Sequence, residues 1–191
     1  MKRIVLTFGL IAGAFFALVL TISMVMEDHV SATTGYIFGY ATMVLAFLMV
    51  YFGIRSYRDN VGGGVISYWR GFAVGISITL IASACYVASW EIVYRKFAPD
   101  FYEKYAAQMI ARARTSGAPQ AVIDKKTTDA AQVVEWSRNP FMNVAMTFIE
   151  PFPVGLLFTL ASAGMLRRKK RGASAGEAPE RSAVGARSTM P

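Results

Sequence analysis

The stretch IVLTFGLIAGAFFALVLTISMVM, residues 4–26, contains 23 residues and no charged side chain. A helix needs about 20 mostly apolar residues to cross the hydrocarbon core of a bilayer, because each residue adds about 1.5 Å. The stretch is therefore long enough to form a transmembrane helix. It is also longer than the apolar core of a cleaved signal peptide, which has about 7–15 residues, so we expect this helix to be retained.

Three further stretches have the same character. Residues 36–54 contain no charged side chain, and residues 71–94 and 141–166 contain one each, Glu91 and Glu150. In lipid every backbone polar group needs a partner within the chain, and long apolar blocks satisfy this need as helices. The alternating polarity of membrane barrel strands is absent from the sequence. The sequence thus predicts an all-α polytopic membrane protein with four transmembrane helices at about residues 4–26, 36–54, 71–94 and 141–166.

The composition agrees with a membrane protein. Of the 191 residues, 54% are hydrophobic and only 17% are charged, whereas about a quarter are charged in a soluble domain. One cysteine and one histidine exclude a disulfide framework, a multi-cysteine zinc site and a histidine cluster. The net charge of +8 includes a basic cluster directly after the last apolar stretch, Arg167, Arg168, Lys169, Lys170 and Arg171. Because such a cluster is typical of a cytoplasmic helix end, we expect a lipid bilayer as partner and no nucleic acid.

The other basic residues near helix ends predict the orientation. Lys2 and Arg3 precede the first predicted helix, and Arg55, Arg58 and Arg70 lie between the second and the third. Since short loops rich in Lys and Arg stay in the cytoplasm, both termini are predicted to be cytoplasmic.

The longest connection, residues 95–140, is predicted to fold outside the cytoplasm. Pro99 and Asp100 begin a helix that runs to about residue 115, a break follows at 116–119, and a second helix runs from 120 to about 137. We therefore expect an extracytoplasmic helical hairpin at about residues 99–137. Asn139 and Pro140 would then cap the last membrane helix.

The domain organisation follows from these segments. Residues 1–170 are expected to form a single membrane domain that includes the hairpin. The tail, residues 171–191, consists mainly of Gly, Ala, Ser, Pro and charged residues. Such a composition cannot bury enough apolar surface to fold, so the tail is predicted to be disordered and cytoplasmic.

Glu150 is the candidate functional residue that the sequence singles out first. A carboxylate inside the hydrocarbon is costly and normally faces a partner or water. Pro151 and Pro153 have no amide hydrogen, so carbonyls one turn earlier lose their helical donors. A carboxylate beside free carbonyls has the chemistry of a cation or proton site. Two structural alternatives stay open: Glu150 caps a helix that begins at Pro151, or it bonds to Ser, Thr or Tyr on a neighbouring helix.

Glu91 completes this candidate intramembrane polar site of Glu150, Glu91, Pro151 and Pro153. It precedes Arg95 by four residues, which predicts a same-face ion pair near the helix end. One histidine and scattered carboxylates predict no metal site and no cofactor. The sequence also lacks an HExxH motif, an Asp within any span and a base for a catalytic serine. We therefore expect no enzyme and no catalytic residue.

Four motifs resemble a known family. They are RSYRD at 55–59, ISYWRGF at 66–72, PDFYEKY at 99–105 and EPFPVG at 150–155. In these motifs the chain resembles the bacterial integral membrane proteins of domain of unknown function 4199, over about residues 4–170. The resemblance implies four membrane helices and a bacterial inner-membrane location. It implies no activity, and it provides no catalytic residue to assign.

Two functional classes follow. The first is a non-enzymatic structural or accessory membrane component, whose hairpin or basic tail docks a partner. The alternative is a small proton- or cation-coupled transporter or channel subunit that uses Glu150 and Glu91. Four helices leave little room for an aqueous path, so the alternative would require oligomers. Glycines spaced by four, as at Gly9 and Gly13, allow close helix contact inside the bundle or between copies, so a homo-oligomer or a membrane-protein partner is consistent with both classes.

Overall fold

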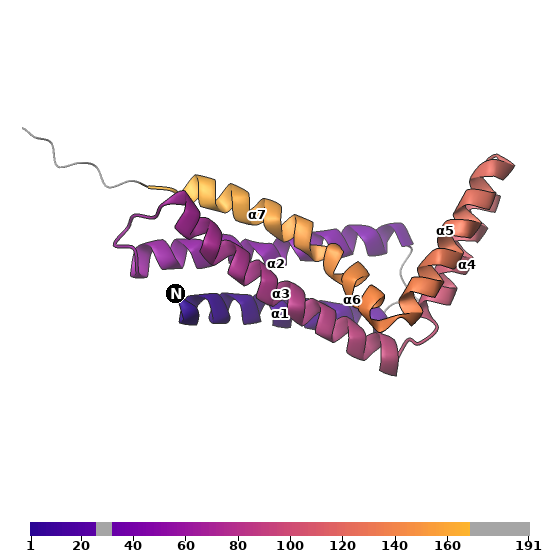
Figure 1. The fold of residues 1–191 in the computed structure, drawn as a ribbon, viewed down its shortest axis with the longest axis horizontal. Helices are drawn as coiled ribbons and strands as arrows, with labels where there is room; N and C mark the ends of the chain where they lie inside the picture. The colour runs from indigo at the N-terminus through magenta and orange to yellow at the C-terminus, as the bar shows by residue number, and fades with distance from the viewer. Residues whose placement is uncertain (26–31, 169–191) are drawn as a thin grey trace, which may run out of the picture.

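A computed structural model describes residues 1–25 and 32–168 of the chain. Three long helices and a divided fourth span lie side by side in an elongated bundle, and two shorter helices project from one end as a hairpin (Figure 1). The helices are α1 Lys2–Val25, α2 Ala32–Asn60, α3 Tyr68–Lys96, α4 Phe101–Thr115, α5 Gln120–Arg138, α6 Pro140–Ile149 and α7 Pro151–Leu166. The described residues contain no strand beyond an isolated bridge between Ile66 and Arg168, so the predicted all-α fold is confirmed.

The four predicted membrane spans are confirmed as helical segments long and apolar enough to cross a bilayer. They are Lys2–Ser23, Ile37–Asn60, Tyr68–Lys96 and Pro140–Leu166. The end of the bundle that holds the α4–α5 hairpin is called the hairpin end below. The N-terminus of α1, the α2–α3 loop and the C-terminus of α7 lie together at the opposite end, called the loop end (Figure 1).

The second and third helices extend beyond their apolar stretches. Arg58 and Arg55 bond to Asp59 at 2.7 and 3.7 Å, so α2 continues to Asn60 although its last turns carry charge. A turn with positive φ at Gly63 and Gly64 follows, a conformation that favours glycine. Ser67 then caps α3 by accepting a hydrogen bond from the backbone N–H of Arg70.

The bundle packs closely because small residues line its helix contacts. A Cβ atom added at Gly9 would lie 2.8 Å from Cγ2 of Ile81, and one added at Gly75 would lie 2.8 Å from Cγ2 of Thr159. These glycines therefore let α1 and α7 approach α3, as expected for pairs of small residues in membrane helices. A Cβ atom at Gly39, by contrast, would meet nothing within 4 Å.

Side chains from all four spans meet in the core between these close contacts. Phe16, Phe47, Val50, Val74 and Ile78 are each at most 2% exposed. Polar groups also lie among them, where the hydroxyls of Thr79 on α3 and Thr159 on α7 are 3.0 Å apart. Both hydroxyls are buried, so this hydrogen bond satisfies groups that lipid could not.

The fourth span is divided into two helices at Glu150, whereas the sequence predicted a continuous helix over 141–166. Asn139 caps α6 by accepting from the backbone N–H groups of Phe141 and Met142, which confirms the predicted cap. α6 ends at Ile149, and α7 begins at Pro151, whose missing N–H suits the first position of a helix. The predicted basic residues Lys169, Lys170 and Arg171 and the predicted disordered tail lie outside the described residues; Arg167 and Arg168 are described and exposed.

A polar chain at the hairpin end of the bundle

Three buried side chains from three helices form a hydrogen-bonded chain where the hairpin joins the bundle. Nε1 of Trp90 on α3 donates to the hydroxyl of Tyr102 on α4 at 3.3 Å. That hydroxyl donates to Oδ1 of Asn143 on α6 at 2.7 Å. Trp90 and Tyr102 are each 8% exposed and Asn143 only 1%. We call these three residues the anchor chain, because they connect the first turn of the hairpin to two membrane helices.

Local sequence places each member of the anchor chain. The hairpin begins with α4 directly after Asp100, so Tyr102 lies in its first turn. Asn143 lies one turn after the cap Asn139, to whose carbonyl oxygen its own N–H donates at 2.9 Å. One turn further, the hydroxyl of Thr147 donates to the carbonyl oxygen of Asn143 at 2.9 Å. Side chains four residues apart share a face of a helix, so Asn139, Asn143 and Thr147 give α6 one polar edge.

Aromatic rings surround the anchor chain and exclude water from it. The ring of Phe101 meets that of Trp90 edge-on at 4.8 Å, and the ring of Tyr94 meets that of Tyr102 at 5.1 Å. Edge-to-face contacts at such distances add to the stabilisation that burial provides. The hydrogen bonds of the anchor chain thus lie in an apolar setting, where leaving one unmade would be expensive.

Two ionisable groups at the start of the hairpin have pKa values shifted in opposite directions, one by burial and one by a neighbouring charge. Burial raises the pKa of the Tyr102 hydroxyl, because burial penalises the charged phenolate. At the surface, the ammonium group of Lys104 lies 2.9 Å from Asp100 and lowers the pKa of that carboxyl group. The Tyr102 hydroxyl therefore stays protonated and able to donate, while Asp100 stays ionised at the start of α4.

Glu150 lies at the break between α6 and α7 and faces α3. The hydroxyl of Tyr86 donates to its Oε2 at 3.0 Å. Of the two structural alternatives, the structure shows a tyrosine partner on a neighbouring helix; α7 does begin at Pro151, but the carboxylate makes no capping hydrogen bond to it. Tyr86 lies 18 residues after the start of α3, about 27 Å along the helix, so this pair is still within the membrane span. Despite its partner, Glu150 remains exposed on the surface of the bundle.

Glu91 has a different partner. Nε and Nη2 of Arg95 each lie 2.9 Å from its Oε2, which confirms the predicted pair four residues apart on α3. Its second oxygen, Oε1, is buried and has no hydrogen-bond partner among the described residues. The structure therefore gives Glu91 and Glu150 separate partners, Arg95 and Tyr86. Within residues 1–25 and 32–168 no group of three His, Cys, Asp or Glu side chains could hold a metal ion.

Sequence reasoning missed the residues that hold this end of the molecule together. It gave Tyr86, Tyr102 and Asn143 no role. A signal was present: Asn143 is an amide inside an apolar stretch, and a buried amide needs a partner. The partner itself was not predictable, because Tyr102 and Asn143 are 41 residues apart and meet only through the fold of the hairpin.

The comparison with protein families gives one finding. The family described as protein of unknown function (DUF4199) matches residues 7–168 of the chain. The matched range includes the hairpin, all three residues of the anchor chain and the break at Glu150. Neither a curated protein nor a solved structure gives a significant match to the chain.

Proposed function

We propose that this chain, which belongs to the DUF4199 family of proteins of unknown function, is a non-enzymatic accessory protein that presents its hairpin to a partner. The observation that carries this proposal is the anchor chain. A hairpin tied through buried hydrogen bonds to α3 and α6 keeps a fixed direction relative to the bundle, as a docking element requires (Figure 1). A linker without a function would need no such buried network.

The chemistry of the hairpin tip indicates the kind of partner. Around the turn, Arg112, Arg114, Lys125 and Lys126 outnumber the carboxylates of Asp124 and Asp129, and Lys125 pairs with Asp129 at 2.9 Å. Arg112 and Arg114 lie in α4 and the other four residues in α5, and the tip as a whole is open to solvent. A cluster of one sign favours a surface of the opposite sign, so the partner is expected to present acidic groups.

The proposal includes a location. Under the positive-inside rule, the basic residues of the loop end favour a cytoplasmic position for that end and for both termini. The hairpin then lies on the extracytoplasmic side of a bacterial inner membrane. A cysteine introduced at residue 118 in the hairpin turn, in a Cys85→Ala background, should react with an impermeant maleimide in whole spheroplasts. A cysteine introduced at residue 63 in the α2–α3 turn should react only after the membrane is opened.

The experiment that tests the docking function removes the tip and keeps the anchor chain. Deleting residues 109–126 and joining the shortened helices with a Gly-Ser turn leaves Tyr102 and the base of both helices intact. Cross-linking in native membranes followed by mass spectrometry should then lose a specific partner, although the protein still inserts. An unchanged set of cross-linked proteins would contradict the proposal.

A charge variant provides a sharper comparison than the deletion. Arg112→Glu with Lys126→Glu reverses two exposed charges and should abolish the same cross-link. Arg112→Lys with Lys126→Arg keeps both charges and serves as the matched control, which should retain the cross-link. If both pairs behave alike, charge complementarity is not what recruits the partner.

A second candidate function, a proton- or cation-coupled transporter or channel subunit, is favoured by one observation. Glu150 is a carboxylate within a membrane span, at a helix break, and it is exposed although Tyr86 donates to it. Intramembrane carboxylates of this kind often lie on ion or proton routes. In proteoliposomes Glu150→Gln should abolish flux under this function, while Glu103→Gln in the hairpin should not. Wild-type flux in the Glu150→Gln variant would eliminate the candidate.

A further inference from the structure

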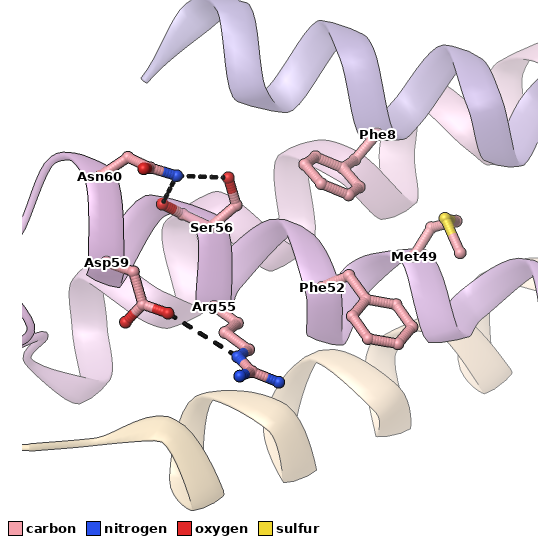
Figure 2. Close-up of a pocket in the computed structure, with 7 residues that line it drawn as sticks. All are labelled: Phe8, Met49, Phe52, Arg55, Ser56, Asp59 and Asn60. Atoms are coloured by element: carbon pink, nitrogen blue, oxygen red, sulfur yellow. Dashed lines mark hydrogen bonds and ion pairs between the residues drawn. The ribbon is translucent and has the colours of Figure 1, made fainter.

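A groove opens between α1 and α2 near the loop end, away from the anchor chain. Its volume is about 360 Å³, and Phe8 of α1 forms one wall. The other lining residues all come from one face of α2: Met49, Phe52, Arg55, Ser56, Asp59 and Asn60. Figure 2 shows that the apolar side chains gather at one end of the groove and the polar ones at the other.

This division of the groove matches the geometry of a phospholipid. From Met49 to Asn60 the groove follows α2 for 11 residues, about 16 Å. Phe8, Met49 and Phe52 lie within the apolar part of the membrane spans, where an acyl chain would run. Arg55 and Ser56 directly follow the uncharged stretch 36–54, at the depth where a headgroup begins.

The polar end retains donors for a phosphate group. Asp59 is bonded closely to Arg58 at 2.7 Å, whereas the guanidinium of Arg55 is 3.7 Å away and its side chain is 55% exposed. Nδ2 of Asn60 donates to Oγ of Ser56 at 3.1 Å, so the serine hydroxyl accepts in this bond and its own proton remains for another acceptor (Figure 2). An arginine and a hydroxyl with unused donors are suited to a phosphate oxygen.

The charge around the groove favours an anionic occupant. Seven described basic residues lie at the loop end: Lys2, Arg3, Arg55, Arg58, Arg70, Arg167 and Arg168. Among the described residues at this end, Asp59 is the only acidic one. Basic clusters next to membrane helices attract anionic lipid headgroups. A zwitterionic lipid would gain less from this field, because its headgroup carries a compensating cation.

We propose that the α1–α2 groove binds one anionic phospholipid. One acyl chain lies against Phe8, Met49 and Phe52, and the phosphate accepts hydrogen bonds from Arg55 and Ser56. The site is separate from the hairpin and from Glu150, so it stands or falls independently of either function proposed above.

The test is native mass spectrometry of the full chain released from detergent with added phosphatidylglycerol or phosphatidylcholine. Wild-type protein should retain phosphatidylglycerol preferentially. Arg55→Ala should lower that retention about tenfold, the effect of losing one charge-assisted hydrogen bond. Arg70→Ala removes an exposed arginine at the same end but outside the groove, and it should leave retention unchanged. Phe52→Ala should lower the retention of both lipids, because it removes part of the apolar wall against which the acyl chain lies. Circular dichroism and melting temperature verify that each variant is folded.

Three results would overturn the proposal. Equal losses in Arg55→Ala and Arg70→Ala would mean that lipid responds to overall charge and not to the groove. Equal retention of the two lipids by the wild type would remove the headgroup selectivity. Displacement of phosphatidylglycerol by millimolar free glycerol phosphate would show that a phosphate group suffices and that the apolar wall has no part in binding.

Discussion

Replacing Tyr102 with phenylalanine removes one hydroxyl and breaks the anchor chain in the middle. The ring and its aromatic contacts remain, because the two side chains have the same shape. The substitution removes the hydrogen bond that Tyr102 donates to Asn143 at 2.7 Å and the one that it accepts from Trp90 at 3.3 Å. Asn143 is 1% exposed, so water does not replace the lost donor. The variant thus tests whether these hydrogen bonds hold the hairpin in place.

The expected cost can be derived from the two groups that lose their partner. An unsatisfied buried polar group costs about 1–3 kcal/mol in a soluble protein. Hydrogen bonds between membrane helices are measured at about 0.6 kcal/mol on average and up to about 1.7. The anchor chain lies at the boundary between these environments, so we expect the free energy of unfolding to fall by about 1–2 kcal/mol. That corresponds to a change of roughly five- to thirtyfold in the unfolding equilibrium.

Hydrogen–deuterium exchange in detergent micelles locates the effect. In Tyr102→Phe the amides of α4 and α5 should exchange faster, while the α1–α3 contact region keeps its protection. Tyr94→Phe is the matched control, because Tyr94 belongs to the same aromatic cluster and its hydroxyl is not part of the anchor chain. The reasoning is refuted if Tyr94→Phe has the same effect, or if protection is lost evenly across the bundle.

Three other predictions concern packing, the membrane carboxylate and pH. Gly75→Leu should destabilise the bundle by about 1–3 kcal/mol in a detergent unfolding titration, because it overpacks the α3–α7 contact, whereas Gly39→Leu should change little. Tyr86→Phe should cost about 1–3 kcal/mol in the same titration, because it removes the hydrogen-bond donor of a carboxylate within the span. The lowered pKa of Asp100 means that its attraction to Lys104 is present above the ordinary carboxyl pKa of about 4 and is lost as pH falls through the folded value. In Lys104→Met, NMR titration should find the Asp100 pKa closer to its ordinary value.

The spans and the hairpin were predictable because each depends on local sequence. Apolar length identifies a membrane helix without knowledge of its neighbours, and the break at 116–119 separates two helices wherever they pack. The boundaries were less predictable. The apolar stretch ends at residue 54, but α2 continues to Asn60, because Asp59 bonds to Arg55 and Arg58 on the same helix. The end of an apolar stretch indicates where the helix leaves the lipid, and the helix itself continues beyond that residue.

The candidate site was only partly predictable, because it depends on which faces of the helices pack against each other. Glu150 was found from its charge, and a tyrosine partner was among the alternatives considered. That Tyr86 is the partner follows from the way α3 packs beside α6 and α7, which the sequence does not state. Glu91 and Glu150 were grouped by residue type, and the structure gives them separate partners.

The break at Glu150 and the hairpin are connected through one short helix. α6 has ten residues and contacts α3, α5 and α7. At one end Asn143 accepts a hydrogen bond from Tyr102 at the base of the hairpin, and at the other Glu150 accepts one from Tyr86. A continuous helix over 140–166 would force α6 to follow the direction of α7. Because the chain is divided before Pro151, α6 is free to take the direction that brings Asn143 to Tyr102. The intramembrane proline therefore helps set the direction in which the hairpin projects, and a variant that restores a continuous helix should weaken the anchor chain even though it changes none of its members.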